Sequence, residues 1–193
     1  MSALAEHTRR NYRSIEELLS HTFRTASTAG RGSPEPLAAV LGISRGFGEY
    51  TPLEVATEAV NMRQLAMRSA GFMGKHILVA LYAYPVQDSE RAEELHSMTV
   101  LAGYCIGLNE RLKDKHFVVD AVRDYCDKRM HHDYEWWAAH LGKHRRHIEY
   151  RWVKRSTEPG AKTIHNLLGQ LSSGAHARVE EALERRNIDW GYA

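Results

Sequence analysis

The amino-acid sequence predicts an all-α fold: a helical domain that contains a helix-turn-helix and carries a flexible N-terminal arm. Apolar residues recur at the three- and four-residue spacing of helices, and no segment shows the two-residue alternation of a half-buried strand. Helix start and stop signals separate these segments. A chain of 193 residues with 43% apolar content can bury a core as one domain with an appended arm.

Residues 1–36 are predicted to form the arm and its linker. A helix can begin at Ser14 in SIEELLSHTFR, but the next segment, TASTAGRGSPEP, is rich in Gly, Ser, Thr and Pro, as flexible linkers are. The first ~24 residues are therefore expected to lie outside the core.

Residues 37–130 are predicted to form a helical bundle. Thr51, Pro52 and Glu54 supply a cap, a first-turn proline and a reciprocating carboxylate for a helix that ends near Gly71. Further helices are expected between Gly74 and Pro85, from Asp88 to Lys113, with Gly103 and Gly107 as weak points, and from Phe117 to Met130. The apolar run from Ile77 to Pro85 is too short for a membrane span and is expected to be a buried helix.

Residues 131–193 are predicted to hold the helix-turn-helix and closing C-terminal helices. Asp133 is a candidate N-cap for YEWWAAHL, Gly142 supplies a turn with positive φ, and a second helix is expected from His144 to Arg155. Ala138 is small enough for the helix crossing. Apolar residues at helical spacing can face the crossing: Trp137, Leu141, Ile148 and Trp152. Of the two adjacent tryptophans, Trp137 is expected inside and Trp136 half-exposed.

The second of these helices is strongly basic. From Lys128 to Arg155, eight lysines and arginines minus three carboxylates give a local charge of +5, although the whole chain carries only +2. A local basic patch can bind DNA phosphates, and arginines near the start of a recognition helix can reach base edges. The predicted DNA-binding residues are Lys143, His144, Arg145, Arg146, His147, Arg151, Lys154 and Arg155. A helical hairpin with a solvated basic face is the alternative.

No catalytic or cofactor signature accompanies this patch, so the protein is predicted not to be an enzyme and to need no cofactor. His140, His144 and His147 have helical spacing, but the turn at Gly142 separates the first from the others, so no metal site is expected. Glu93 and His96 form a single ExxH, whereas a di-metal bundle needs two. The two cysteines, Cys105 and Cys126, lie in apolar helical contexts and are expected to be buried thiols.

The segment after Gly160 is predicted to contain two amphipathic helices. One apolar stripe comprises Ile164, Leu167, Leu168 and Leu171, and the other comprises Ala175, Val179, Ala182 and Leu183. These stripes can either close the core around the helix-turn-helix or form a dimer surface, and the sequence leaves both alternatives open.

Residues 119–155, VDAVRDYCDKRMHHDYEWWAAHLGKHRRHIEYRWVKR, resemble the C-terminal module of phage late-gene regulators of the Q antitermination type. Asp124-Tyr125-Cys126, Ala138-Ala139 and the basic segment from Gly142 occupy the places of that family's aromatic stretch, its entry into a sigma-region-4-like helix-turn-helix, and its recognition helix. The zinc-type cysteine cluster of some members is absent.

The resemblance implies a phage protein in the cytoplasm of a bacterial host. It would bind double-stranded DNA near a late promoter and engage RNA polymerase as a monomer or homodimer, without contacting a membrane. The absence of a signal peptide and the low cysteine content favour the same compartment. Two rival functions are a small terminase-like packaging protein, which would form a larger oligomer, and an all-α module that binds an acidic protein.

Overall fold

The computed structural model describes residues 12–28, 52–85, 87–109, 112, 114–128, 130, 132–153, 160–186 and 188. These residues are all-helical, as predicted, and contain no strand. The helices are α2 (Ile15–Thr28), α4 (Pro52–Ser69), α5 (Gly71–Tyr82), α6 (Asp88–Leu108), α7 (Lys115–Tyr125), α8 (Tyr134–Leu141), α9 (Arg145–Val153) and α10 (Ala161–Arg185).

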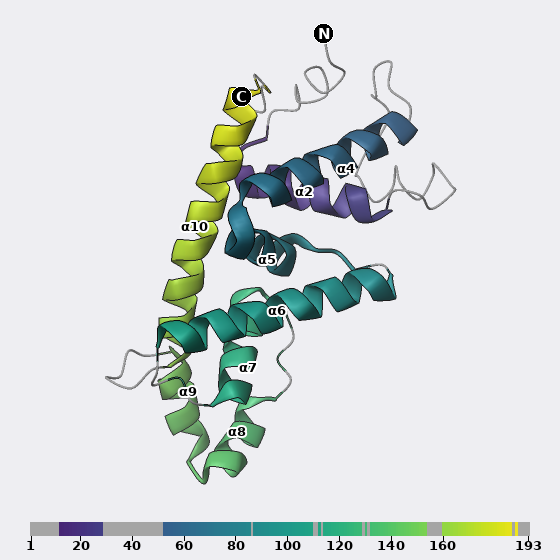
Figure 1. Ribbon diagram of the computed structural model, residues 1–193. Coiled ribbons are helices and arrows are strands. Elements are labelled where there is room, and N and C mark those ends of the chain that lie inside the picture. Colours follow the sequence, from purple (N-terminus) through teal and green to yellow (C-terminus); the bar gives the residue numbers. More distant parts are fainter. Residues whose placement is uncertain are drawn as a thin grey trace.

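Helix α10 runs along one side of the molecule, and the other helices are arranged along its length (Figure 1). Helices α2, α4 and α5 lie towards its C-terminal end, and α6 and α7 lie nearer its N-terminal end. The short helices α8 and α9 form the opposite tip of the molecule. Contacts join α10 to α2, α4, α5, α6, α7 and α9.

The continuity of α10 corrects the prediction of two C-terminal helices. It is one helix from Ala161 to Arg185, and Gly169 and Gly174 do not interrupt it. Its buried side chains recur every three to four residues along most of its length: Ile164, Leu168, Ser172, Ala175, His176, Val179 and Leu183. Because both predicted apolar stripes lie on this one face, packing against the rest of the core outweighs the cost of glycines within the helix. Between the two alternatives, the buried stripe residues close the core.

Helix α2 corrects the prediction that the first ~24 residues lie outside the core. The helix begins as expected after Ser14, whose Oγ accepts a hydrogen bond from the Glu17 N–H at 3.3 Å. Leu18, Leu19 and Phe23 are buried, and the helix packs against α4. An amphipathic pattern with a cap was therefore a stronger signal than the composition of the segment that follows it. Residues 1–11 and 29–51, which include Thr51 and most of the predicted linker, lie outside the described residues.

The helix also continues into the start of the predicted linker, as far as Thr28. Thr25, Ser27 and Thr28 are buried there. The Thr28 hydroxyl lies within hydrogen-bonding distance of the Thr25 and Arg24 carbonyl oxygens, at 3.0 and 3.2 Å. A local hydrogen bond of this kind lets a hydroxyl be buried at a helix end, so linker-like residues belong to the core.

The remaining helices differ from prediction mainly at their ends. Helix α5 begins at Gly71, with φ of +80°, rather than near Gly74. Helix α6 passes through Gly103 and ends at Leu108, five residues before the predicted end. Helix α7 ends at Tyr125 rather than Met130, and Asp127 follows with a positive φ of 55°. Residues 77–80 of the apolar run are buried in α5, as predicted, but the helix ends at Tyr82 and Tyr84 is 50% exposed. No helix in the described part of the chain has the length and apolarity for a membrane crossing.

Helices α5 and α10 approach each other closely at Gly74. A Cβ atom placed on Gly74 would lie 3.3 Å from the Ala175 Cβ and 3.0 Å from the Ala70 Cβ. Both distances are shorter than ordinary van der Waals contact. Gly74 therefore sets how closely α10 can lie on α5.

Gly74→Leu should destabilise the fold by about 1–3 kcal/mol, because the added side chain forces the two helices apart. Gly103→Leu is the matched control, since Gly103 lies on an exposed face of α6 with no described atom within 4 Å of an added Cβ. That change should stabilise the protein by up to about 1 kcal/mol through helix propensity. Urea unfolding of both variants measures the difference. Equal effects would mean that the contact at Gly74 does not limit packing.

Two buried histidines make stability depend on pH. His176 on α10 lies 3.0 Å from the Tyr82 hydroxyl through Nε2 and 3.4 Å from Glu16 through Nδ1. Burial lowers the pKa of His176, and the Glu16 carboxylate only partly opposes this. His76 lies 3.1 Å from the Ser97 hydroxyl, and its pKa is lowered chiefly by burial too.

Lowering the pH from about 7.5 to about 5.5 should therefore lower the Tm. As the pH falls through about 6.5, these histidines become protonated in the unfolded chain but stay neutral in the folded protein, where their pKa values are lower. The unfolded state is therefore favoured, and the stability present above that pH is lost. His176→Gln and His76→Gln should each flatten the dependence of Tm on pH, as measured by calorimetry. An unchanged slope in both variants would contradict this origin.

Candidate nucleic-acid interface

Helix α8 begins at the predicted cap. The Asp133 carboxylate accepts a hydrogen bond from the Trp136 N–H at 2.7 Å, and Asp133 itself has extended backbone. This bond satisfies one of the free N–H groups in the first turn of the helix. The prediction of an N-cap at Asp133 is confirmed.

The turn after α8 depends on Gly142. Gly142 has φ of 60° and ψ of 34°, the left-handed conformation that glycine adopts without steric cost. The Lys143 N–H donates to the Ala138 carbonyl at 2.9 Å, and the Gly142 N–H donates to the Ala139 carbonyl at 3.2 Å. These two bonds form a Schellman motif, which ends α8 and turns the chain. The predicted position and conformation of the turn are confirmed.

His144 caps the start of α9. Its Nδ1 accepts a hydrogen bond from the Arg146 N–H at 3.2 Å, and its carbonyl accepts bonds from the N–H groups of His147 and Ile148. Since Nδ1 is the acceptor, the ring proton of a neutral His144 lies on Nε2. That N–H is a donor for an external acceptor.

Apolar side chains hold the two helices against the core. Trp137 is fully buried and Ile148 is 2% exposed, while Ala138 and Leu141 pack at the edge of the core. The Trp137 ring lies edge-on to Phe117 of α7, with centroids 5.8 Å apart. The burial predicted for Trp137 is confirmed, and Trp136 is 39% exposed. The side chain of Trp152 lies outside the described residues.

A buried carboxylate on α7 positions α8. Asp120 is fully buried, and its Oδ2 accepts a hydrogen bond from the Trp137 indole Nε1 at 3.0 Å. The same oxygen lies 3.0 Å from His132 Nδ1. A buried indole N–H needs an acceptor, and a histidine proton offsets part of the cost of burying the carboxylate. Asp120 therefore links α7, the segment before α8, and α8 itself.

Three rings stack on the outer face of α8. The Trp136 ring stacks with His132, with centroids 3.7 Å apart, and with His140, with centroids 4.6 Å apart. The interplanar angles are 27° and 14°. Trp136 therefore packs against two histidine rings while remaining partly exposed.

Arg145 forms an ion pair with one carboxylate on each of the two helices. Its Nη1 donates to Glu135 of α8 at 2.8 Å, and its Nε donates to Glu149 of α9 at 2.8 Å. The hydrogen bond and charge of Glu149, followed by the charge of Glu135, raise the pKa of Arg145. Two carboxylates therefore balance the charge of a residue that the sequence presents as a candidate base-reader.

The other predicted cations are placed differently. Lys143, His144, Arg146 and His147 are exposed together around the turn and the first turn of α9. No ion pair joins Lys143 or Arg146 to a carboxylate within the described ranges. Arg151 lies on α9, but its side chain, like Lys154 and Arg155, falls outside the described residues.

Other candidate groups are separate from this surface. Within the described residues no three His, Cys, Asp or Glu side chains form a metal-binding group. Glu93 of the ExxH pairs with Arg63 at 2.9 Å. Cys105 and Cys126 are free and buried, as predicted, and burial raises the pKa of their thiols to about 11 and about 12.

Sequence reasoning missed the roles of Asp120 and Arg145. The only signal for Asp120 is indirect: Trp137, predicted to be buried, carries an N–H that must find an acceptor. For Arg145, Glu149 lies four residues later on the same helix, a spacing at which opposite charges pair.

Comparison with family models, curated proteins and solved structures finds no significant match to this chain.

Asp120→Ala should destabilise the protein by about 1–3 kcal/mol, because it leaves the buried Trp137 indole N–H without an acceptor. Asp120→Asn keeps an amide oxygen at the same place and should lose less. Urea unfolding followed by tryptophan fluorescence measures both variants. Equal losses would mean that the negative charge, and not the acceptor oxygen, carries the effect.

Proposed function

We propose that this protein binds double-stranded DNA through the tip formed by α8 and α9. The observation that carries the proposal is the exposed set Lys143, His144, Arg146 and His147, which gathers cationic and donor groups at the start of α9. The tip lies at the end of the molecule away from α2 and α4, where a duplex can approach it (Figure 1). Two short helices joined by a glycine turn are the arrangement that places a second helix in the major groove.

The proposed contacts divide into two kinds. Lys143 and the Nε2–H of His144 donate to phosphates, which fix the position of the protein without reading sequence. Arg146 lies in the first turn of α9, where side chains of recognition helices meet base edges, and arginine pairs with guanine in a bidentate manner. Arg151, Lys154 and Arg155 stay in the proposed interface as sequence-predicted residues.

Arg145 takes a different role in this proposal. Its bonds to Glu135 and Glu149 make it a brace that sets the orientation of α9 relative to α8. Base reading is therefore assigned to Arg146 rather than shared between the two arginines. His147 remains a candidate phosphate donor beside Arg146.

The finer proposal is a sequence-specific transcription regulator, of the kind that phage late-gene antitermination proteins represent. What supports it is the resemblance of residues 119–155 to the C-terminal module of those proteins. It predicts a monomer or homodimer that acts with RNA polymerase in a bacterial cell. Selection of bound fragments from random DNA, followed by transcription through a terminator placed downstream of the selected site, tests both steps.

Arg146→Ala and Lys143→Ala should each weaken binding to duplex DNA. Each lost phosphate contact should reduce the slope of log K against log salt by about 0.9. If Arg146 instead reads a base, its loss should cost about 1–3 kcal/mol on a selected site and much less on scrambled DNA. Fluorescence anisotropy of a labelled duplex over a salt series measures both quantities.

Arg68→Ala is the control, because it removes the same charge from an exposed position on α4, at the other end of the molecule. It should leave the salt slope unchanged. Equal effects of Arg68→Ala and Arg146→Ala would mean that DNA binding depends only on the net charge of the protein, and would contradict an interface at the tip. A large ring-shaped oligomer in sedimentation would favour DNA packaging over transcription control.

A further inference from the structure

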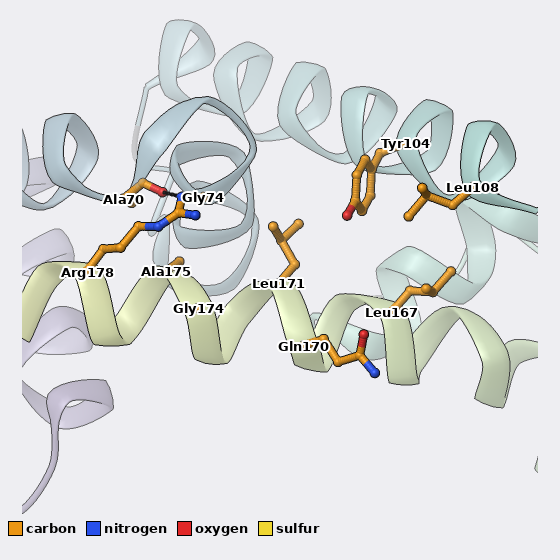
Figure 2. A pocket seen from close by; sticks show the side chains of 10 residues that line it. All are labelled: Ala70, Gly74, Tyr104, Leu108, Leu167, Gln170, Leu171, Gly174, Ala175 and Arg178. Atoms are coloured by element: carbon orange, nitrogen blue, oxygen red, sulfur yellow. Dashed lines mark hydrogen bonds between the residues drawn. The ribbon is translucent and has the colours of Figure 1, made fainter.

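A cavity of about 250 Å³ lies between α5, α6 and α10, away from the α8–α9 tip (Figure 2). Its walls combine small residues at one end with larger apolar side chains at the other. Ala70, Gly74, Gly174 and Ala175 form the first group, and Leu108, Leu167 and Leu171 belong to the second. The volume is somewhat below the range of roughly 300–1,000 Å³ typical of drug-sized ligands, so it suits a smaller molecule.

The end with small residues carries a positive charge. Arg178 of α10 lies beside Ala70 and Gly74 in Figure 2, and its Nη1 donates to the Ala70 carbonyl at 3.1 Å. The guanidinium can lie this close to the chain because residue 71 is glycine: a Cβ there would be 2.7 Å from Nη1. Of the five guanidinium N–H groups, this bond uses one. No ion pair joins Arg178 to a carboxylate among the described residues.

The other end is lined by three leucines together with Tyr104 and Gln170, and it is partly open. Leu167 and Leu171 rise from α10 towards α6, and Leu108 of α6, 56% exposed, faces Leu167 across the cavity (Figure 2). Arg178 and Leu167 are eleven residues apart on α10, which corresponds to about 16 Å along a helix. The cavity is therefore elongated, with a cation at one end and leucines at the other.

We propose that this cavity binds a small carboxylate with an unbranched hydrocarbon tail. The carboxylate pairs with the free guanidinium N–H groups of Arg178, and the tail lies between Leu171, Leu167 and Leu108. A guanidinium fork matches a carboxylate in charge and geometry, whereas the leucines gain from removing a tail from water. This function is additional to DNA binding, and its test requires no DNA.

Octanoate is a suitable probe, because it has both features and is shorter than the cavity. Calorimetric titration should show that octanoate binds more tightly than 1-octanol, which has the tail without the charge, and than acetate, which has the charge without the tail. Arg178→Gln should weaken octanoate binding by about tenfold or more through loss of charged hydrogen bonds, while octanol binding should change little. Equal affinities for octanoate and octanol in the native protein would overturn the proposal.

Gly174→Leu places a side chain in the cavity, and no described atom lies within 4 Å of the added Cβ, so the fold should be kept. This variant should lose octanoate binding. Gly103→Leu adds the same side chain to an exposed helical glycine outside the cavity and should bind as the native protein does. Octanoate binding that survives Gly174→Leu, or that is lost equally in both variants, would place the ligand elsewhere and contradict the assignment.

Discussion

The packing of α10 against the other helices is the constraint on which the whole structure depends. Ile164, Leu168, Val179 and Leu183 are almost completely buried, and the helix contacts elements at both ends of the molecule. Full burial of such side chains contributes about 1.5–3 kcal/mol each, and the net stability of a domain is only about 5–15 kcal/mol. Because the same helix contacts α5 and α9, it joins the α2–α4–α5 end to the tip.

Polar interactions, by contrast, shape the tip. Asp133 starts α8, the bonds around Gly142 end it, and His144 starts α9. Asp120 accepts a hydrogen bond from the buried Trp137 indole, while Arg145 of α9 pairs with Glu135 of α8 at the surface. Because hydrogen bonds are directional, each of these groups fixes the orientation of a helix as well as its contact with a neighbour, which apolar packing alone does not do. The exposed cations of the turn thus stand on a scaffold whose geometry is set by a few hydrogen bonds.

The local features of this scaffold were predictable because they depend on neighbouring residues. A cap at Asp133 and a left-handed turn at Gly142 follow from side-chain chemistry over a few positions, and Trp137 follows from helical spacing. The continuity of α10 was not predictable, since packing against distant helices outweighs the weak signal of two glycines. The pairing of Arg145 with Glu135 was not predictable for a related reason: Glu135 lies ten residues away and meets Arg145 only after the turn has folded.

The two buried cysteines give the molecule a pair of internal reporters of motion. The reactive form of a cysteine is the thiolate, and at neutral pH it is scarce for thiols whose pKa is raised to about 11 and about 12. Reagents therefore reach these sulfurs chiefly when the surrounding helices separate. Cys105 lies within α6, and Cys126 directly follows α7 at the end of that helix away from Phe117, which packs on Trp137. Their relative modification rates would distinguish local opening at the C-terminal end of α7 from opening of α6.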